Sequence, residues 1–403
     1  MNNTIKLAVA AALLAGASSA NAGIMIPAGD WTLDIGGVVN AYYTSTRQSG
    51  TGGAAPLGIN NDAGKTTSNI TTGLLPNYLS VSGKTRQNDL DVGFTISLNP
   101  GASTTQAGRQ SPQQENRQAF LTFGDASWGS IKLGKDLGIF ASDAILNDMT
   151  LLGVGSGAGM LAGNTTTLGR IGTGFIYADW KAQVAYSSPN WNGFSFTAGL
   201  TQSWNAVNAV LVGSGSNQRG GSEPAFEGKA SYAWAGDVAG KVWVSGITQK
   251  VKGLSGANTN DRAESFDIGA NVNMAGFGLT GYYYDGRGIG QTLQLFDGFD
   301  AAGNRRDSNG GYVQGTYTIP GVGTKLGVSW GESTLDTNSG ADSLANGSVK
   351  DEMWTIGAYH PLTKHLNLVA EYSDVKHTVD AHATTAETVG KSKTIALGAI
   401  LFF

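Results

Sequence analysis

The sequence predicts an all-β protein: a transmembrane, antiparallel, sixteen-stranded β-barrel with one long loop folded into its lumen. Three observations lead to this prediction. Runs of residues alternate between apolar and polar side chains over lengths typical of membrane strands. Short turns and long polar loops follow each other along the chain. One connection, residues 135–170, is long and too apolar to be a solvated loop.

Composition excludes several other classes of protein. The 403 residues include 60 glycines, 9 prolines and no cysteine, and the net charge is −4. Without cysteine, disulfides and thiolate metal sites are excluded, and an acidic chain has no electrostatic reason to bind nucleic acid. Many glycines with few prolines favour strands and tight turns over a low-complexity linker.

The N-terminus has the pattern of a secretory signal peptide over residues 1–22. Lys6 supplies the positive region, residues 7–17 the apolar region, and Ala20-Asn21-Ala22 a small-residue cleavage site. We therefore expect an exported mature protein, residues 23–403, that forms a single barrel domain. Beyond the signal, no apolar run is long enough for a membrane helix.

Strand patterns follow in order along the mature chain. From Trp31 to Tyr43 the odd-numbered residues form one face and the even-numbered residues the other, and a hairpin follows at 78–85 and 90–98. Seven short turns are expected near 87–89, 124–129, 189–193, 237–240, 275–276, 320–323 and 361–365. Eight long loops are expected near 45–75, 100–115, 135–175, 204–225, 252–263, 287–309, 335–349 and 377–390. Together they separate sixteen strands, enough to enclose a water-filled channel.

The loop at 135–170 is the unusual element. It contains apolar residues that need shelter: Leu137, Ile139, Phe140, Ile145, Leu146, Met149, Leu151 and Leu152. In an all-β chain the inside of the barrel offers that shelter. Our hypothesis is that this loop folds inward and narrows a pore.

Two segments carry a resemblance to a known family. Arg117-Gln-Ala-Phe-Leu-Thr-Phe-Gly-Asp-Ala-Ser-Trp-Gly-Ser-Ile-Lys-Leu-Gly-Lys135 resembles the stretch of the Gram-negative general porins that leads into their constriction loop. Val184-Ala-Tyr-Ser-Ser-Pro-Asn-Trp-Asn-Gly-Phe194 resembles the hairpin that follows it. The last residue, Phe403, ends an alternating strand and resembles the signal that the outer-membrane assembly machinery reads.

The resemblance implies a function. It implies a homotrimer in the bacterial outer membrane, in contact with lipid and lipopolysaccharide, assembled with the help of the barrel-assembly machinery and periplasmic chaperones. The expected activity is passive diffusion of small hydrophilic solutes and ions through a water-filled channel. It implies no catalysis, cofactor or metal. The alternative is a substrate-specific outer-membrane channel for sugars or small organic acids.

The resemblance also suggests which charges line the constriction, because in that family acids on the loop face a basic wall. The basic wall is expected to include Arg117, Lys135 and Arg170, and the loop acids are expected to be Asp148, Asp143 and Asp136. Arg117 has the alternative of an interfacial or turn-side position, and Asp136 and Asp143 that of capping turns in the loop. Because much of the remaining acid falls in outer loops, we expect a weak preference for anions.

Two departures from the family pattern weaken the expected charge contrast. The loop tip, Leu151 to Gly157, has no carboxylate, and Tyr78 stands where many members carry a wall arginine.

Overall fold

The computed structural model describes residues 23–54, 57–59, 64–102, 114–157, 166–206, 223–252, 254, 260–300, 302–337, 347–380 and 386–403. Its strands are β1 (Ile24–Ala28), β2 (Trp31–Gly50), β3 (Thr66–Thr71), β4 (Tyr78–Gln87), β5 (Leu90–Pro100), β6 (Gln114–Glu115), β7 (Ala119–Asp125), β8 (Gly129–Leu137), β9 (Trp180–Ser187), β10 (Phe194–Thr201), β11 (Ala225–Trp234), β12 (Val238–Lys252), β13 (Asn260–Met274), β14 (Phe277–Arg287), β15 (Asp307–Thr318), β16 (Lys325–Asp336), β17 (Ser348–Pro361), β18 (Leu366–Val379) and β19 (Thr388–Phe402). Two short helices, α2 (Ser142–Leu146) and η1 (Met149–Leu152), lie between β8 and β9. The predicted signal peptide, residues 1–22, lies outside the described residues. Within the described ranges no helix is long and apolar enough to cross a membrane.

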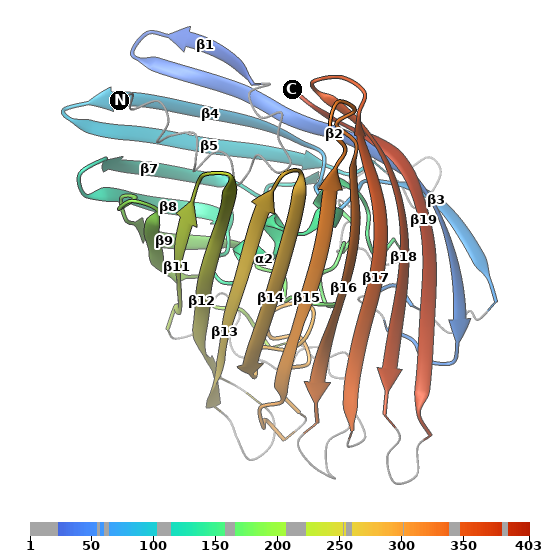
Figure 1. The fold of residues 1–403 in the computed structure, drawn as a ribbon. Coiled ribbons are helices and arrows are strands. Elements are labelled where there is room, and N and C mark those ends of the chain that lie inside the picture. The colour runs from blue at the N-terminus through green and yellow to red at the C-terminus, as the bar shows by residue number, and fades with distance from the viewer. Residues whose placement is uncertain are drawn as a thin grey trace.

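The strands form one closed antiparallel barrel (Figure 1). Its last strand, β19, pairs with its first long strand, β2, from Phe402 opposite Val38 to Gly390 opposite Gly50. At this seam the Gly37 N–H donates to the Phe403 carbonyl at 2.7 Å, and the Phe403 N–H donates to the Gly37 carbonyl at 3.1 Å. Closure matters because an unpaired backbone group in hydrocarbon costs several kcal/mol.

The nineteen strands in the described part of the chain make sixteen barrel strands. Both β3 and β4 pair with β2, and both β6 and β7 pair with β5, so each couple is one interrupted barrel strand. The short β1 pairs with the start of β2, beyond the point where β19 ends. The predicted sixteen-stranded antiparallel barrel is therefore confirmed.

Alternation along each strand separates a lipid-facing surface from the interior. In β19, Ile395 and Leu397 are 51% and 52% exposed, whereas Thr394, Ala396 and Ile400 are buried. An apolar outer face and a more polar inner face are what a strand between lipid and water requires.

The connection after the first strand differs from the prediction. The sequence predicts a loop over 45–75, but β2 continues to Gly50 and β3 runs back beside it. Thr46 and Gln48 keep the alternation and point inward, where the Thr46 hydroxyl lies 2.8 Å from that of Thr394. This stretch is polar on both faces, so it lacks the apolar alternation from which a strand can be predicted.

Short turns close the hairpins at one end of the barrel. Asn88 and Asp89 have φ of 49° and 63°, and Ala275 and Gly276 have φ of 49° and 84°. Two consecutive positive φ values are typical of a type I′ turn. The twist of this turn matches the twist of the two strands that it joins in a two-residue hairpin. The long connections lie at the other end, and the one between β8 and β9 runs into the barrel, where α2 is seen behind the front strands (Figure 1).

Candidate functional site

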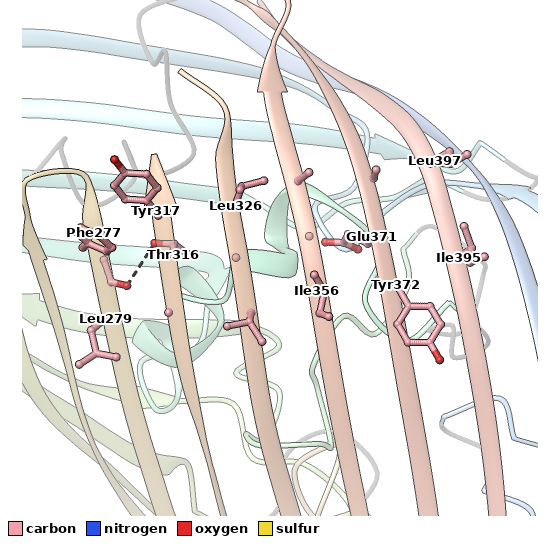
Figure 2. Close-up of a pocket in the computed structure, with 17 residues that line it drawn as sticks. Phe277, Leu279, Thr316, Tyr317, Leu326, Ile356, Glu371, Tyr372, Ile395 and Leu397 are labelled. Carbon is pink, nitrogen blue, oxygen red and sulfur yellow. Dashed lines mark hydrogen bonds between the residues drawn. The ribbon is translucent and has the colours of Figure 1, made fainter. Parts of the chain in front are cut away.

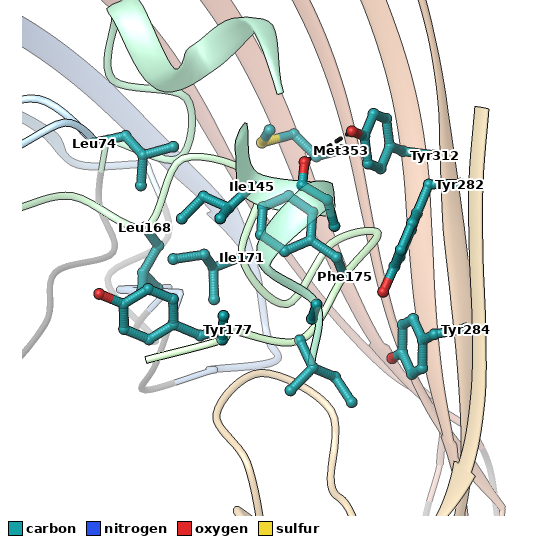
Figure 3. Packing of buried hydrophobic residues seen from close by; sticks show 14 of the residues in the cluster. Leu74, Ile145, Leu168, Ile171, Phe175, Tyr177, Tyr282, Tyr284, Tyr312 and Met353 are labelled. Carbon is teal, nitrogen blue, oxygen red and sulfur yellow. Dashed lines mark hydrogen bonds between the residues drawn. The ribbon is translucent and has the colours of Figure 1, made fainter. Parts of the chain in front are cut away.

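The loop between β8 and β9 occupies the interior of the barrel. It runs from Gly138 to Asp179, later than predicted, because β8 continues to Leu137 and β9 begins only at Trp180. Its apolar side chains pack against inward-facing residues of the wall (Figure 3). The loop contributes Ile145, Leu168, Ile171, Phe175 and Tyr177 to this cluster, and the wall contributes Tyr282, Tyr284, Tyr312 and Met353.

Glu227 on β11 fixes the start of the loop. One carboxylate oxygen accepts the backbone N–H groups of Ile139 and Phe140, each at 2.8 Å. The other oxygen lies 2.6 Å from the Lys181 ammonium, and both charged side chains are fully buried. A buried carboxylate needs such partners, because leaving it unpaired would cost several kcal/mol.

Glu371 on β18 fixes the tip of the loop in the same way. One carboxylate oxygen accepts the N–H groups of Val154 and Gly155 at 2.7 and 2.9 Å, and the other accepts the Tyr359 hydroxyl at 2.6 Å. A Cβ on Gly153 would lie 2.2 Å from the Glu371 carboxyl carbon. The glycines at the tip therefore let the backbone approach the carboxylate closely.

The segment between β3 and β4, residues 72–77, also contacts the loop at its tip. The Leu74 N–H donates to the Gly153 carbonyl at 2.8 Å, and the Gly73 carbonyl accepts the Thr167 N–H at 3.2 Å. The Asn40 side chain holds this segment, since it accepts the Gly73 N–H at 2.9 Å and donates to the Leu75 carbonyl at 2.8 Å. The segment that interrupts this barrel strand therefore lies in the lumen, in contact with the loop.

Asp143, in α2, faces two lysines of the wall. Its carboxylate pairs with Lys229 of β11 at 3.1 Å and with Lys241 of β12. Burial by itself would raise the pKa of Asp143, but the two ammonium groups together lower that pKa below its usual value. The carboxylate is therefore charged at neutral pH.

Asp148 and Arg170, both residues of the loop, lie close together and are buried. Asp148 caps η1, accepting the Thr150 N–H at 3.0 Å and the Thr150 hydroxyl at 2.6 Å. Arg170 donates to the Met353 carbonyl at 3.0 Å, and its guanidinium lies 5.9 Å from the centre of the Tyr312 ring. Burial raises the pKa of Asp148, although the nearby Arg170 opposes that shift. Because Asp148 and Arg170 are 3% and 0% exposed, neither presents its charge to a passing solute.

Lys135 lies on the outer face of β8. Its strand neighbours Lys132 and Asp136 form an ion pair on the inner face, and alternation turns Lys135 the other way, opposite the exposed Ala182 of β9. Its ammonium donates to the Asn116 carbonyl at 2.8 Å. Asp136 is therefore a wall residue rather than a loop acid, and Lys135 lies outside the inner wall.

Arg117 is buried at the base of the loop. Its side chain is 4% exposed, and its Nε lies 2.8 Å from the Glu115 carboxylate. Its guanidinium also lies 5.7 Å from the centre of the Trp180 ring. Arg117 thus supports the region between β6 and β7 instead of facing open lumen.

The sequence prediction missed the charged residues that hold the loop: Glu227, Lys229, Lys241 and Glu371. A signal for them exists, because in each of these strands the alternation places the charge on the face opposite the apolar, lipid-facing residues. Which of these charges the loop contacts depends on its path across the barrel, and local alternation does not specify that path.

Comparison with known proteins agrees with this architecture. A family model described as Gram-negative porin matches residues 8–380. No curated protein sequence matches the chain. Among solved structures, the outer-membrane channel DcaP of Acinetobacter baumannii superposes with a TM-score of 0.65 at 16% identity, over 92% of this chain and 98% of that one. An anion-selective porin from Comamonas acidovorans gives 0.62 at 15% identity, over 93% and 100%. In-vitro folded OmpT of Vibrio cholerae, in its trimer form, gives 0.53 at 14% identity, over 93% and 99%. At these identities the structural likeness shows the fold alone.

Proposed function

This chain belongs to the Gram-negative porin family, and we propose that its channel passes small hydrophilic anions more readily than cations. As a porin it is an outer-membrane channel through which small hydrophilic solutes and ions diffuse passively. Selectivity in such a channel comes from its width and its lining charge, not from chemistry on the solute.

The inner wall from β8 to β12 carries the proposal. Lys132 and Lys229 keep 30% and 26% of their side chains exposed, whereas their partners Asp136 and Asp143 keep 10% and 6%. A solute that passes the docked loop therefore meets ammonium groups more readily than carboxylates. One solved porin of this fold is anion-selective, which agrees with the proposal.

The reversal potential of the refolded protein in a planar bilayer under a salt gradient tests this preference. A unit charge roughly 10 Å from the ion path in water changes the energy of an ion by about 0.4 kcal/mol. Replacing Lys229 by glutamine should therefore lower the ratio of anion to cation permeability by up to about fourfold before screening. Lys132→Gln should act in the same direction.

Lys135→Gln is the matched control, because Lys135 lies on the same strand as Lys132 but on the outer face. It should leave the reversal potential unchanged. Cation preference in the unmodified protein, or an equal shift from Lys135→Gln, would contradict the proposal.

We propose further that three copies form the working channel and that the chain reaches the outer membrane through the cleavable segment 1–22. OmpT, which shares the fold, was solved in a trimer form. Phe403, which closes the seam against Gly37, is the proposed signal for the assembly machinery. Light scattering of the detergent-extracted protein should give the mass of three mature chains, and a single-chain mass would reject the trimer.

A further inference from the structure

The helical part of the inward loop, α2 and η1, turns an uncharged surface to the lumen. Its two acids, Asp143 in α2 and Asp148 at the start of η1, are both buried. Its half-buried side chains are Leu146, Asn147 and Leu151. Because the loop lies within the closed barrel, the exposed part of these three side chains faces the water of the lumen. A passing solute therefore meets two leucines and one amide on this side, and no charge.

Lipid accounts for the apolar side chains on the outside of the barrel, but not for these two leucines. Ile356 and Ile395 lie on the outer surface, whereas Glu371, on the strand between theirs, reaches inward to the loop (Figure 2). Leu146 and Leu151 lie inside the barrel, where no lipid reaches them, and only part of their surface packs against the core cluster. Their remaining surface is therefore available to a solute in the channel.

The inner wall that the loop leaves accessible is basic and rich in hydroxyl groups. Lys132 of β8 lies directly opposite Thr122 of β7 on the inner face, and Thr122 lies opposite Gly93 of β5. Thr95, two residues along β5, shares this face, and its hydroxyl lies 2.9 Å from that of Ser82 on β4. These side chains are half-buried, whereas many inward-facing side chains from β13 to β18 are fully buried under the loop. The polar wall therefore borders the open part of the lumen.

The two sides of the passage differ in kind, and this difference favours one type of anion. Contact between an apolar group and the leucines removes water from apolar surface on both partners, which is favourable. A carboxylate on the same solute keeps polar neighbours if it turns to the lysine and the hydroxyl groups of the wall. A hydroxyl group placed against the leucines would instead lose water without gaining a hydrogen bond, which is unfavourable.

We propose that this channel selects amphipathic monocarboxylates, small anions that combine one carboxylate with an apolar body. The carboxylate contacts Lys132 and the hydroxyl groups beside it, and the apolar body contacts Leu146 and Leu151. This selection rests on the anion preference proposed above and adds a choice among anions of equal charge. A carboxylate whose body carries hydroxyl groups passes less readily, because the loop offers those groups two leucines and a single amide.

Reversal potentials measure this choice, with chloride on one side of a planar bilayer and a carboxylate on the other. Butyrate and its γ-hydroxy derivative have the same charge and carbon skeleton, but only butyrate ends in a methyl group. Burying one methylene completely changes an equilibrium about fourfold, and contact with one wall buries roughly half of its surface, so butyrate should be about twofold more permeant. Leu146→Asn combined with Leu151→Asn keeps the size of both side chains and should bring the ratio of the two permeabilities to about one.

Because the two carboxylates are nearly equal in size, a change in pore width alters both permeabilities alike and leaves their ratio unchanged. The matched control is Leu293→Asn, because Leu293 packs against the same core cluster from the connection between β14 and β15. It should leave the ratio unchanged, whereas Asn147→Leu, which extends the apolar surface of the loop, should raise it.

Equal permeability of the two carboxylates in the unmodified protein would overturn the proposal. So would a ratio that the double leucine variant does not change, or one that Leu293→Asn lowers equally. The preference for chloride over potassium is measured separately in KCl. Failure of the carboxylate test therefore leaves the proposed anion preference intact, whereas cation preference in KCl would contradict that preference itself.

Discussion

Replacing Glu371 by alanine should release the tip of the inward loop and leave the barrel closed. The change removes the acceptor for three groups: the N–H of Val154, the N–H of Gly155 and the Tyr359 hydroxyl. A buried donor left unsatisfied costs about 1–3 kcal/mol. Water reaches a released loop, so we take the lower end, about 3 kcal/mol for the three groups. That free energy corresponds to an increase of about 150-fold in the population with the tip undocked.

Hydrogen exchange of the tip, followed by mass spectrometry on peptides covering residues 150–157, measures this population directly. Exchange at these amides should speed up by about two orders of magnitude in Glu371→Ala, while strand amides of β18 stay protected. Single-channel recordings should show added current noise. Ser373→Ala is the matched control, because Ser373 lies two residues along the same inner face and bonds Thr355. If Glu371→Ala and Ser373→Ala exchange alike, the carboxylate does not hold the tip.

Two further predictions concern acid and the barrel seam. The folded-state pKa of Asp143 is lowered, so its ion pairs stabilise the docked loop above the unfolded value of about 3.9 and are lost as pH falls through the lower folded value. Loop exchange should therefore rise below about pH 4, and Asp143→Asn should abolish that dependence; a loop insensitive to acid would contradict it. Gly37→Ala should lower the melting temperature and refolding yield, because its Cβ would lie 2.3 Å from the Tyr78 carbonyl and 2.7 Å from the Phe403 ring. Gly281→Ala, with nothing within 4 Å of the added carbon, should be tolerated, and equal effects of the two changes would refute the argument.

The packing of the inward loop could be predicted from the sequence, whereas the positions of the charges around it could not. The length and apolar content of the loop correctly indicated that it packs against the inner wall, as Phe140 and Phe175 do. The proposed charges were less accurate. Lys135 lies on the outer face because it is one residue away from the inward-facing Asp136, and Arg170, within the loop, is fully buried. Motif resemblance locates such residues in the chain, but the register of a strand decides which side of the wall they face.

The barrel could be predicted from local patterns in the sequence. These patterns are local: alternation with a period of two, turn residues between strands and a final aromatic residue. Each can be recognised in its own segment without reference to the rest of the chain. The residues that line the lumen, in contrast, depend on long-range contacts. Glu227 and Glu371 lie far from the loop in the sequence, and closure of the sheet brings them to its backbone. Loop path and strand register together set these contacts, and both depend on the whole barrel because a hydrogen bond forms only where its two groups meet within about 3 Å.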